Sequence, residues 1–412
     1  MSVTHVVGAG IAGLAAAVRL TKAGRKVVLH EAANQAGGRC RSFHDAKLDR
    51  IVDNGTHLIL GANPALFEFL KAVGGSLQEC APAAFPFFDR QDCKGWTIKP
   101  SKGAIPWWVL NPSARLPGTN ALDYLGGLRL MTAGPDATVA QAVRTGEMLD
   151  RLWGPLCEAI LNSSPQEGQA RLLGEVLKRT LLKGEAACRP YLAPLGLTAA
   201  LIDPAVAWLR AQGCEIRFNH RLTAIDSGAL VFDDGERARY YKDVPAILAV
   251  APWVASDLLP ALPRFETRPI VCAHFLLPKP EEKLPGGRAY LGIVRGLGQW
   301  WSLRGDVLSV TVSAATDLAS LPGEDIAAKL WAECALMLGQ APDLPPYRVM
   351  KEQRATLAHT PATERLRPGP FDGPPGLILA GDWTATGLPC TLEGAALSGQ
   401  RAVHRDFLSS PC

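Results

Sequence analysis

A glycine-rich turn near the start of the chain constrains the fold more than any other stretch of the sequence. A Gly-x-Gly-x-x-Gly motif occupies residues 8–13, directly after a β-branched run at residues 3–7. An alanine-rich segment follows at residues 14–23, and a second apolar run at residues 26–30 ends at Glu31. This order predicts a strand, a helix and a second strand in a parallel β-α-β unit, with the glycines at the strand-to-helix turn.

Each glycine of the motif has a physical reason for its position. Gly8 permits the tight turn, Gly10 lets a pyrophosphate approach the backbone, and Gly13 lets the helix pack closely on the strand. The free N–H groups and the dipole at the helix start attract phosphate, and a carboxylate at the end of the second strand accepts hydrogen bonds from a ribose diol. The unit therefore predicts a dinucleotide site formed by Gly8, Ala9, Gly10, Ile11, Ala12, Gly13, Glu31 and Ala32.

A second glycine pair indicates which dinucleotide binds. Gly37, Gly38 and Arg39 follow Glu31 at a spacing that resembles that of flavoproteins such as the amine oxidases and phytoene desaturases. In those proteins the glycines let the loop pass close to the cofactor, and the arginine lies against it. A fixed guanidinium can neutralise a pyrophosphate. The resemblance implies FAD as the cofactor, with Gly38 and Arg39 in contact with it.

The C-terminal region carries a motif that complements the first one. An apolar run at residues 376–380 ends in a Gly-Asp pair, and a Thr-Leu-Glu-Gly sequence then begins an apparent helix. A carboxylate at a strand end can accept hydrogen bonds from ribityl hydroxyls, and a helix start can stabilise the negative charge of a reduced flavin. The expected FAD contacts here are Gly381, Asp382, Thr391, Leu392 and Glu393.

Composition limits the class of protein. The chain has 412 residues, which suits about two domains, and its 48% hydrophobic content indicates a globular protein. A net charge of +4 is small for this length and gives no case for nucleic-acid binding. None of the ten cysteines forms a CxxC pair, and we interpret Cys272 and His274 as core packing, so no metal site is expected.

Targeting signals are not evident in the sequence. The N-terminus enters a predicted strand at once, which argues against a signal peptide and for reduced cysteines in the cytoplasm. No apolar run approaches the roughly 18 residues that a membrane span needs. Peripheral contact with the inner face of the cell membrane stays open.

A stretch rich in proline, phenylalanine and tryptophan lies at residues 82–110. Three interpretations compete for it, namely ordinary core, a hydrophobic substrate pocket, and a loop that dips into a membrane, because tryptophan favours the membrane interface. Helical periodicity follows at residues 122–131, 138–161 and 169–182. In a flavoenzyme these helices would form the roof of a substrate cavity.

The order of motifs along the whole chain resembles that of the squalene-associated FAD-dependent desaturases, a family of hydroxysqualene dehydroxylases within the amine oxidase and phytoene desaturase superfamily. The segments at residues 53–61 and 156–162 favour this subgroup, whereas the cofactor motifs are shared more widely. The family usually has glutamine where Thr56 stands and methionine where Leu392 stands. The two departures concern the surroundings of the flavin ring.

The resemblance implies an α/β protein with a Rossmann-like FAD-binding domain of the glutathione-reductase type and an interleaved α+β substrate domain. The expected FAD-binding domain is discontinuous and comprises residues 1–61, 200–257 and 370–412. Residues 62–199 and 258–369 would form the substrate domain with its helical insertion. The resemblance also implies that further FAD contacts come from Gly55, Thr56, His57, Leu222, which would clamp the adenine, Ala251 and Trp253.

The implied reaction is reductive. Reduced FAD would deliver hydride from N5 to the allylic carbon of hydroxysqualene while its hydroxyl leaves as water, which gives squalene. The hydroxyl needs a proton donor, and His57 is the first candidate because it should lie near the ring, with Asp53 as the second. A purely structural role for His57 beside the cofactor is the competing interpretation.

Other activities remain as alternatives. They are an oxidative isoprenoid desaturase, an amine oxidase, and a non-enzymatic partner that holds flavin and transfers prenyl substrate. The predicted partners are the hydrophobic isoprenoid substrate and an external electron donor, with no nucleic acid.

Overall fold

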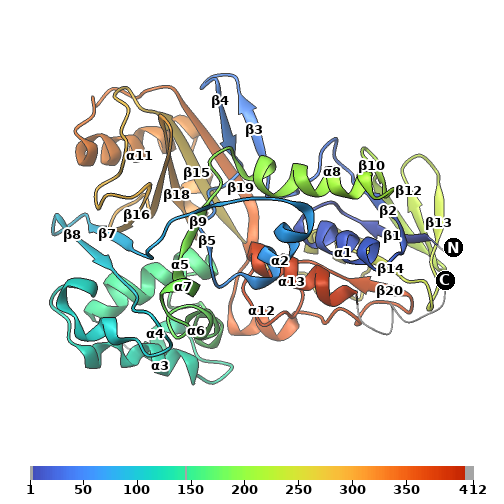
Figure 1. Cartoon of the computed structure of the whole chain (residues 1–412), viewed down its shortest axis with the longest axis horizontal. Coiled ribbons are helices and arrows are strands. Elements are labelled where there is room, and N and C mark those ends of the chain that lie inside the picture. Colours follow the sequence, from blue (N-terminus) through green and yellow to red (C-terminus); the bar gives the residue numbers. More distant parts are fainter. Residues whose placement is uncertain (1–2, 144–145, 404–412) are drawn as a thin grey trace.

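The computed structural model describes residues 3–143 and 146–403. The remaining residues, which include parts of the predicted 138–161 helix and of the predicted 370–412 segment, lie outside the described residues. The architecture consists of a parallel sheet with helices on its faces, a larger mixed sheet, and a helical lobe (Figure 1).

The parallel sheet is built around the glycine-rich N-terminus. Its strand order is β10-β2-β1-β14-β20, and all neighbours are parallel. In sequence order the strands run 3-2-1-4-5, which is the doubly wound arrangement of dinucleotide-binding proteins. The strands are β1 (Val3–Val7), β2 (Lys26–His30), β10 (Glu215–Arg217), β14 (Ala246–Leu248) and β20 (Leu377–Leu379).

Four helices pack into one apolar core beside this sheet. They are α1 (Ile11–Lys22), α2 (Pro64–Val73), α8 (Asp203–Ala211) and α13 (Leu392–Ala402). α1 and α13 approach so closely that a Cβ on Gly399 would lie 2.1 Å from the Ala12 carbonyl oxygen. The two ends of the chain therefore meet at one place in the fold, as the paired motifs predict.

The larger sheet has seven strands in the order β19-β15-β18-β17-β16-β7-β8. One of its faces packs on α11 (Gly323–Leu338) and α10 (Thr316–Ser320) through residues such as Val310 and Trp331. The strands are β7 (Phe85–Asp89), β8 (Lys94–Ile98), β15 (Thr267–Leu276), β16 (Tyr290–Val294), β17 (Trp300–Arg304), β18 (Val307–Val312) and β19 (Tyr347–Leu357).

The helical lobe lies next to β7 and β8, at the end of the molecule away from β1 (Figure 1). Its α-helices are α3 (Leu125–Met131), α4 (Val139–Val143), α5 (Gly154–Leu161), α6 (Ala170–Arg179) and α7 (Glu185–Cys188). The predicted helix at residues 138–161 is interrupted, because Gly146 lies in a bend with φ +125°. A π-turn at Leu149–Trp153 then leads directly into α5. Pro155 lacks an N–H group, and the wider π-turn accommodates that gap in the helical ladder.

Smaller elements complete the chain. α9 (Pro252–Leu258) begins shortly after β14, and α12 (Pro361–Leu366) follows β19. Short 3₁₀ turns occupy Trp107–Leu110, Pro112–Ala114 and Ala121–Tyr124, and a second π-turn at Thr198–Ile202 precedes α8. The remaining strands are β3 (Ser42–Asp45), β4 (Arg50–Asp53), β5 (Ile59–Leu60), β6 (Gln78–Glu79), β9 (Pro190–Leu192), β11 (Leu222–Asp226), β12 (Ala229–Phe232) and β13 (Arg237–Arg239).

The stretch rich in proline and aromatic residues divides between two environments. Phe87, Trp96 and Trp108 are buried, and the first two belong to the β7–β8 hairpin. Trp107 is 58% exposed, although it is next to Trp108 in the chain. The core interpretation therefore holds for part of the stretch, and the rest forms surface.

Candidate functional site

The turn between β1 and α1 has the close contacts that its glycines predict. Gly8 has φ +102°, and a Cβ there would lie 2.4 Å from the Ala249 carbonyl oxygen. A Cβ on Gly13 would lie 1.8 Å from the Gly8 carbonyl oxygen. A Cβ on Gly10, in contrast, has no neighbour within 4 Å among the described residues. The start of α1 thus faces open space, with Ile11 and Ala12 buried behind it in the first helical turn.

Glu31 fixes the loop after β2. Its Oε2 accepts a hydrogen bond from the Ala9 N–H at 2.7 Å, and its Oε1 accepts one from the Ala33 N–H at 2.9 Å. Ala32 is half-buried between them. The carboxylate is therefore held at the end of β2, where the sequence predicts a ribose contact, and each oxygen keeps lone-pair capacity for a hydroxyl donor.

Leu222 lies beyond Glu31, at the start of β11, and is buried in the core that β11 and β12 share with β1. Next to it the imidazoles of His5, His30 and His220 form a stack, with nitrogen–nitrogen distances of 3.0 and 2.9 Å. Burial and the two neighbouring rings lower the pKa of His30 to about 3, so the central ring of the stack is neutral. The stacked imidazoles of His5, His30 and His220 therefore support the segment that carries Leu222.

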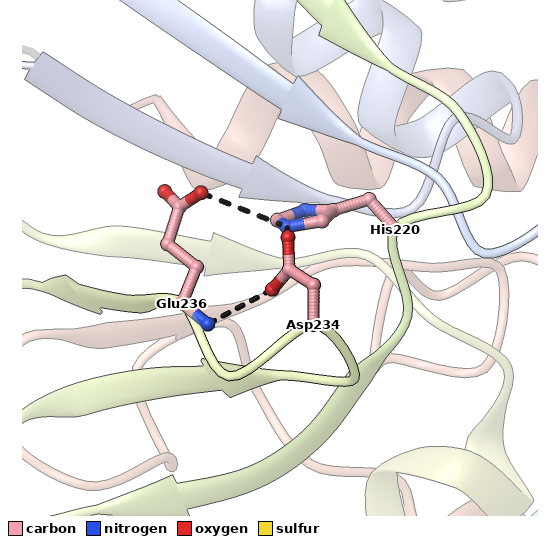
Figure 2. A group of neighbouring side chains, drawn as sticks. All are labelled: His220, Asp234 and Glu236. Carbon is pink, nitrogen blue, oxygen red and sulfur yellow. Dashed lines mark hydrogen bonds and ion pairs between the residues drawn. The ribbon is translucent and has the colours of Figure 1, made fainter.

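One group among the described residues has the spacing of a possible metal site. Figure 2 shows that His220 points toward Asp234 and Glu236, with its Nε2 3.2 Å and 3.9 Å from their carboxylate oxygens. Glu236 is already paired with Arg217 at 2.6 Å. The positive charge beside these carboxylates is thus the Arg217 guanidinium and not a metal ion, and the residues form an ion-pair network.

Arg39 and Asp382, which were predicted as separate cofactor contacts, lie together. The Arg39 guanidinium is 2.6 Å from Asp382 Oδ1, and it also donates to the Ala355 carbonyl at 2.5 Å. The charge of Arg39 is thus matched by a carboxylate of the chain itself. Gly38, which is exposed, approaches Gly10, and a Cβ on Gly38 would lie 3.5 Å from the Gly10 Cα. Both glycine loops therefore face the same space.

The loop after β20 is held by a buried guanidinium that the sequence did not single out. Arg367 donates to the carbonyl oxygens of Asp382, Thr384 and Leu388 at 2.7, 2.6 and 2.8 Å. Glu364 pairs with Arg367 at 2.8 Å. No sequence motif marks Arg367, and only the arginine content around it gave a signal that a cation could fix the motif at residues 381–391.

His359 extends this support to the start of α13. Its Nε2 accepts a hydrogen bond from the Cys390 N–H at 2.9 Å, so its Nδ1 carries the proton and donates to Glu364 at 2.6 Å. Burial by itself raises the pKa of Glu364, but His359 and Arg367 outweigh it and lower that pKa. Glu364 is therefore ionised, and the segment that precedes α13 is rigidly placed.

The N-terminus of α13 has the geometry expected of an anion-stabilising helix start. Thr391 caps the helix by accepting a hydrogen bond from the Gly394 N–H at 3.1 Å, and Leu392 opens the first turn. The Gly381 N–H donates to Ser398 of the same helix at 2.9 Å. The motif at the strand end and the motif at the helix start thus lie beside each other, as the sequence predicts.

Glu393 has a structural role. Its two carboxylate oxygens accept hydrogen bonds from the Ala65 and Leu66 N–H groups at 3.1 and 3.0 Å. These donors belong to the first turn of α2, so Glu393 caps a helix 328 residues away in the chain. Each oxygen keeps further lone-pair capacity, so the cofactor contact predicted for Glu393 stays a prediction.

Asp53, the second candidate proton donor, is tied into the scaffold. Its Oδ1 accepts hydrogen bonds from Ser42 Oγ at 2.6 Å and from the Leu197 N–H at 3.0 Å. Its Oδ2 is 2.6 Å from Arg304. These contacts tie Asp53 to β3, to β17 and to the segment before α8, and its role as a proton donor stays a prediction.

His57 lies in the segment after β4, and its side chain keeps exposed surface. Burial lowers the pKa of His57, and Arg39 lowers it further against the opposing effect of Asp53. The imidazole is neutral near pH 7, and it suits a hydrogen-bonding role better than proton donation.

Gly55 and Thr56 directly precede His57 in the segment after β4. A Cβ on Gly55 has no neighbour within 4 Å among the described residues, and Thr56 Oγ1 lies 3.8 Å from Cys272 Sγ. Cys272 and His274 are buried, as predicted, on the sheet face toward this segment. Burial raises the pKa of a thiol, but His274, Thr311 and Thr56 outweigh it and lower the pKa of Cys272.

Ala251 and Trp253 lie at the start of α9. Ala251 is the N-cap residue, and the half-buried Trp253 ring lies 5.1 Å below the Arg354 guanidinium. Arg354 neighbours Ala355, whose carbonyl accepts from Arg39. Trp253 is thereby linked through β19 to the Arg39–Asp382 pair.

Membrane-spanning elements were sought among the same residues. In residues 3–143 and 146–403 no helix combines the length and the apolar character required to cross a bilayer.

Comparison with known proteins identifies the family. Residues 11–405 match the model of the flavin-containing amine oxidoreductases. The chain is 43% identical to the hydroxysqualene dehydroxylase of Rhodopseudomonas palustris and 40% identical to that of Sinorhizobium fredii, each over 97% of both chains. A solved structure, cyclohexylamine oxidase from Brevibacterium oxydans, superposes with a TM-score of 0.69 at 17% identity over 98% of both chains. The chain therefore belongs to the flavin-containing amine oxidoreductases and, within them, to the family of hydroxysqualene dehydroxylases.

Proposed function

We propose that this chain is an FAD-dependent hydroxysqualene dehydroxylase, which removes the hydroxyl group of hydroxysqualene reductively to give squalene. The observation that carries the proposal is the identity of 38–43% with three proteins of that name, over nearly the whole length of each. The arrangement of the predicted cofactor contacts supports it, because Arg39 near the N-terminus pairs with Asp382 near the C-terminus.

Several residues of the candidate site suit FAD. The open space at Gly10 and the start of α1 would receive the pyrophosphate, and Glu31 would receive the ribose. The start of α13 at Thr391 would face the ring, where its dipole stabilises negative charge. FAD, when bound and reduced, supplies the hydride. The chain itself holds the ligand, orients it against the seven-stranded sheet and excludes water with apolar walls.

Replacing Gly10 with alanine tests the pyrophosphate position. The new methyl group meets no protein atom within 4 Å among the described residues, so the flavin-free variant should unfold at the same denaturant concentration as the wild type. Its affinity for FAD should fall about tenfold or more, a loss of about 1.4 kcal/mol, because the methyl group occupies the space of the phosphate. Equal affinity in titrations of both proteins would place the pyrophosphate elsewhere.

An anaerobic single-turnover experiment tests the activity. Protein with bound FAD is reduced, freed of excess reductant and mixed with hydroxysqualene. We expect the visible absorbance of oxidised flavin to return, with one squalene formed per flavin. An unchanged spectrum would support a flavin-holding partner instead. Flavin reduction on addition of squalene or an amine to oxidised protein would support an oxidative desaturase or an amine oxidase.

We also propose that the helical lobe contacts a membrane, from which the apolar substrate would enter. Six large apolar side chains are exposed there, and Leu122 is 71% exposed. Two 3₁₀ turns carry three of them, and these turns are in contact through Trp108 and Tyr124, whose ring centroids are 5.1 Å apart. Exposed Lys102 and Arg129 flank them. This apolar surface consists of Ile105, Trp107, Leu110, Leu122, Leu125 and Leu128.

Vesicle sedimentation tests the apolar surface. Wild-type protein should sediment with vesicles that contain anionic lipid, and a variant with Trp107→Ser, Leu110→Ser and Leu128→Ser should lose at least about tenfold in binding, since each buried apolar side chain contributes roughly 1.5–3 kcal/mol. Leu336→Ser removes a comparably exposed leucine from α11 and should bind as the wild type does. If the triple variant bound equally well, this surface would not be the contact.

A further inference from the structure

A β-bulge interrupts β19 where this strand reaches the candidate cofactor contacts. The pairing of β19 with β15 shifts between Arg268 and Ile270, so that three residues of β19 lie opposite Pro269 alone. Proline has no N–H group to donate to this stretch. Bulges change the direction in which side chains point, and they are frequent beside active sites. The residues of this bulge are Gln353, Arg354 and Ala355.

The bulge is joined to the cofactor motifs at both ends of the chain. The Ala355 carbonyl accepts a hydrogen bond from Arg39 at 2.5 Å, and Arg39 pairs with Asp382 at 2.6 Å. Arg39 directly follows Gly38, and a Cβ on Gly38 would lie 3.5 Å from the Gly10 Cα. The bulge therefore lies beside the loop that carries the predicted pyrophosphate contacts.

Arg354 presents a guanidinium at this bulge. Its Cζ lies 5.1 Å from the centroid of the Trp253 ring, and the side chain is exposed. Within residues 3–143 and 146–403, no hydrogen bond or ion pair engages this guanidinium, so its N–H donors are free to bind an anion. The other exposed arginine of β19, Arg348, pairs with Asp45 at 3.4 Å.

The charges around Arg39 show why a further cation matters here. Asp382 matches the charge of Arg39. The Asn54 side-chain amide donates both to the Arg39 carbonyl at 3.4 Å and to Glu352 at 3.1 Å, which brings a second carboxylate to the same place. Two carboxylates beside one guanidinium would repel an anionic pyrophosphate. Arg354, two residues after Glu352, restores the positive charge.

We propose that Arg354 binds the pyrophosphate of FAD, and that Trp253 is the positioning residue that holds its guanidinium in place. The inference rests on the proposed function, because it takes FAD as the cofactor. A guanidinium presents a planar fork of N–H groups that matches two phosphate oxygens. Arg39 then fixes the bulge to Asp382, and Arg354 supplies the charge that Arg39 shares with its own carboxylate.

Arg354→Gln tests the inference in flavin-free protein. Calorimetric titrations with FAD and with ADP, which contains the pyrophosphate but no flavin ring, measure the two affinities. We expect both to fall about tenfold or more, because a charge-assisted hydrogen bond to phosphate is lost. The difference from the wild type should narrow at high salt, which screens the charges. The variant should unfold at the wild-type denaturant concentration, since Arg354 is exposed and has no ion pair.

Three further variants separate the position of the charge from its presence. Arg348→Gln removes the other exposed arginine of β19 and is the matched control, which should bind FAD and ADP as the wild type does. Arg354→Lys keeps the charge but loses the planar fork, and its affinities should be intermediate. Trp253→Leu removes the ring beneath the guanidinium and should weaken ADP binding less than Arg354→Gln does.

The outcome with ADP decides the inference. Wild-type ADP affinity in Arg354→Gln would overturn it, even if FAD affinity fell, because the guanidinium would then act on another part of the cofactor. An equal loss in Arg348→Gln would also overturn it, since the effect would follow the net charge of the surface. These titrations contain no hydroxysqualene. A wild type that binds FAD but forms no squalene would therefore overturn the proposed reaction and leave the role of Arg354 intact.

Discussion

Gly13→Ala is expected to prevent the chain from forming a stable flavin-binding protein. The added Cβ would lie 1.8 Å from the Gly8 carbonyl oxygen, which is backbone and cannot rotate away. Either α1 or the turn has to move, and the helix is also packed against α13 through Gly399. Overpacking of this kind costs about 1–3 kcal/mol or more, and here it would act on the element around which the parallel sheet is arranged.

Chemical unfolding followed by tryptophan fluorescence measures this effect in flavin-free protein. Gly134→Ala is the control, since a Cβ at that position has no neighbour within 4 Å among the described residues, and it should unfold as the wild type does. Gly10→Ala adds a second comparison, because it should impair FAD binding without affecting the fold. A Gly13→Ala protein as stable as the wild type would contradict the packing described for α1.

Arg367→Ala should be almost as damaging, although the residue lies outside every motif that the sequence displays. The substitution leaves the buried carbonyl groups of Asp382, Thr384 and Leu388 without their donor, and it removes the cation beside Glu364. Removing one partner of a buried pair costs about 3–5 kcal/mol. The loop that leads to α13 should lose its shape, and FAD affinity should fall with the free energy of unfolding.

Denaturant unfolding and FAD titration of the same samples test this prediction. Arg264→Ala breaks an exposed ion pair with Asp257 and should change the free energy of unfolding by less than about 0.5 kcal/mol. Arg367→Lys should not restore the loop, because an ammonium group cannot present the planar fork that reaches three carbonyl groups. Wild-type stability in Arg367→Ala would show that the loop is held by other contacts.

The parts of the fold that the sequence predicts well are those that depend on local chemistry. The β1-α1-β2 unit follows from hydrophobic runs and from a turn in which Gly13 packs directly on Gly8. The start of α13 likewise follows from Thr391 as a capping residue. The helix predicted at residues 169–182 corresponds to most of α6, because its periodic apolar residues form the buried face of that helix.

Contacts between distant segments account for what the sequence could not predict. Glu393 caps α2, Arg304 pairs with Asp53 and Arg367 organises a loop, and each of these depends on the tertiary arrangement. Pro252 is a local signal for the start of α9, since proline favours the first turn of a helix.

The central claim is that the two ends of the chain build one FAD site, and titration of flavin-free protein with FAD tests it most directly. The account predicts saturation at one FAD per chain, with quenching of flavin fluorescence as the ring becomes buried, and weaker binding by Gly10→Ala. A wild-type protein that stays colourless and leaves the fluorescence of added FAD unchanged would contradict it.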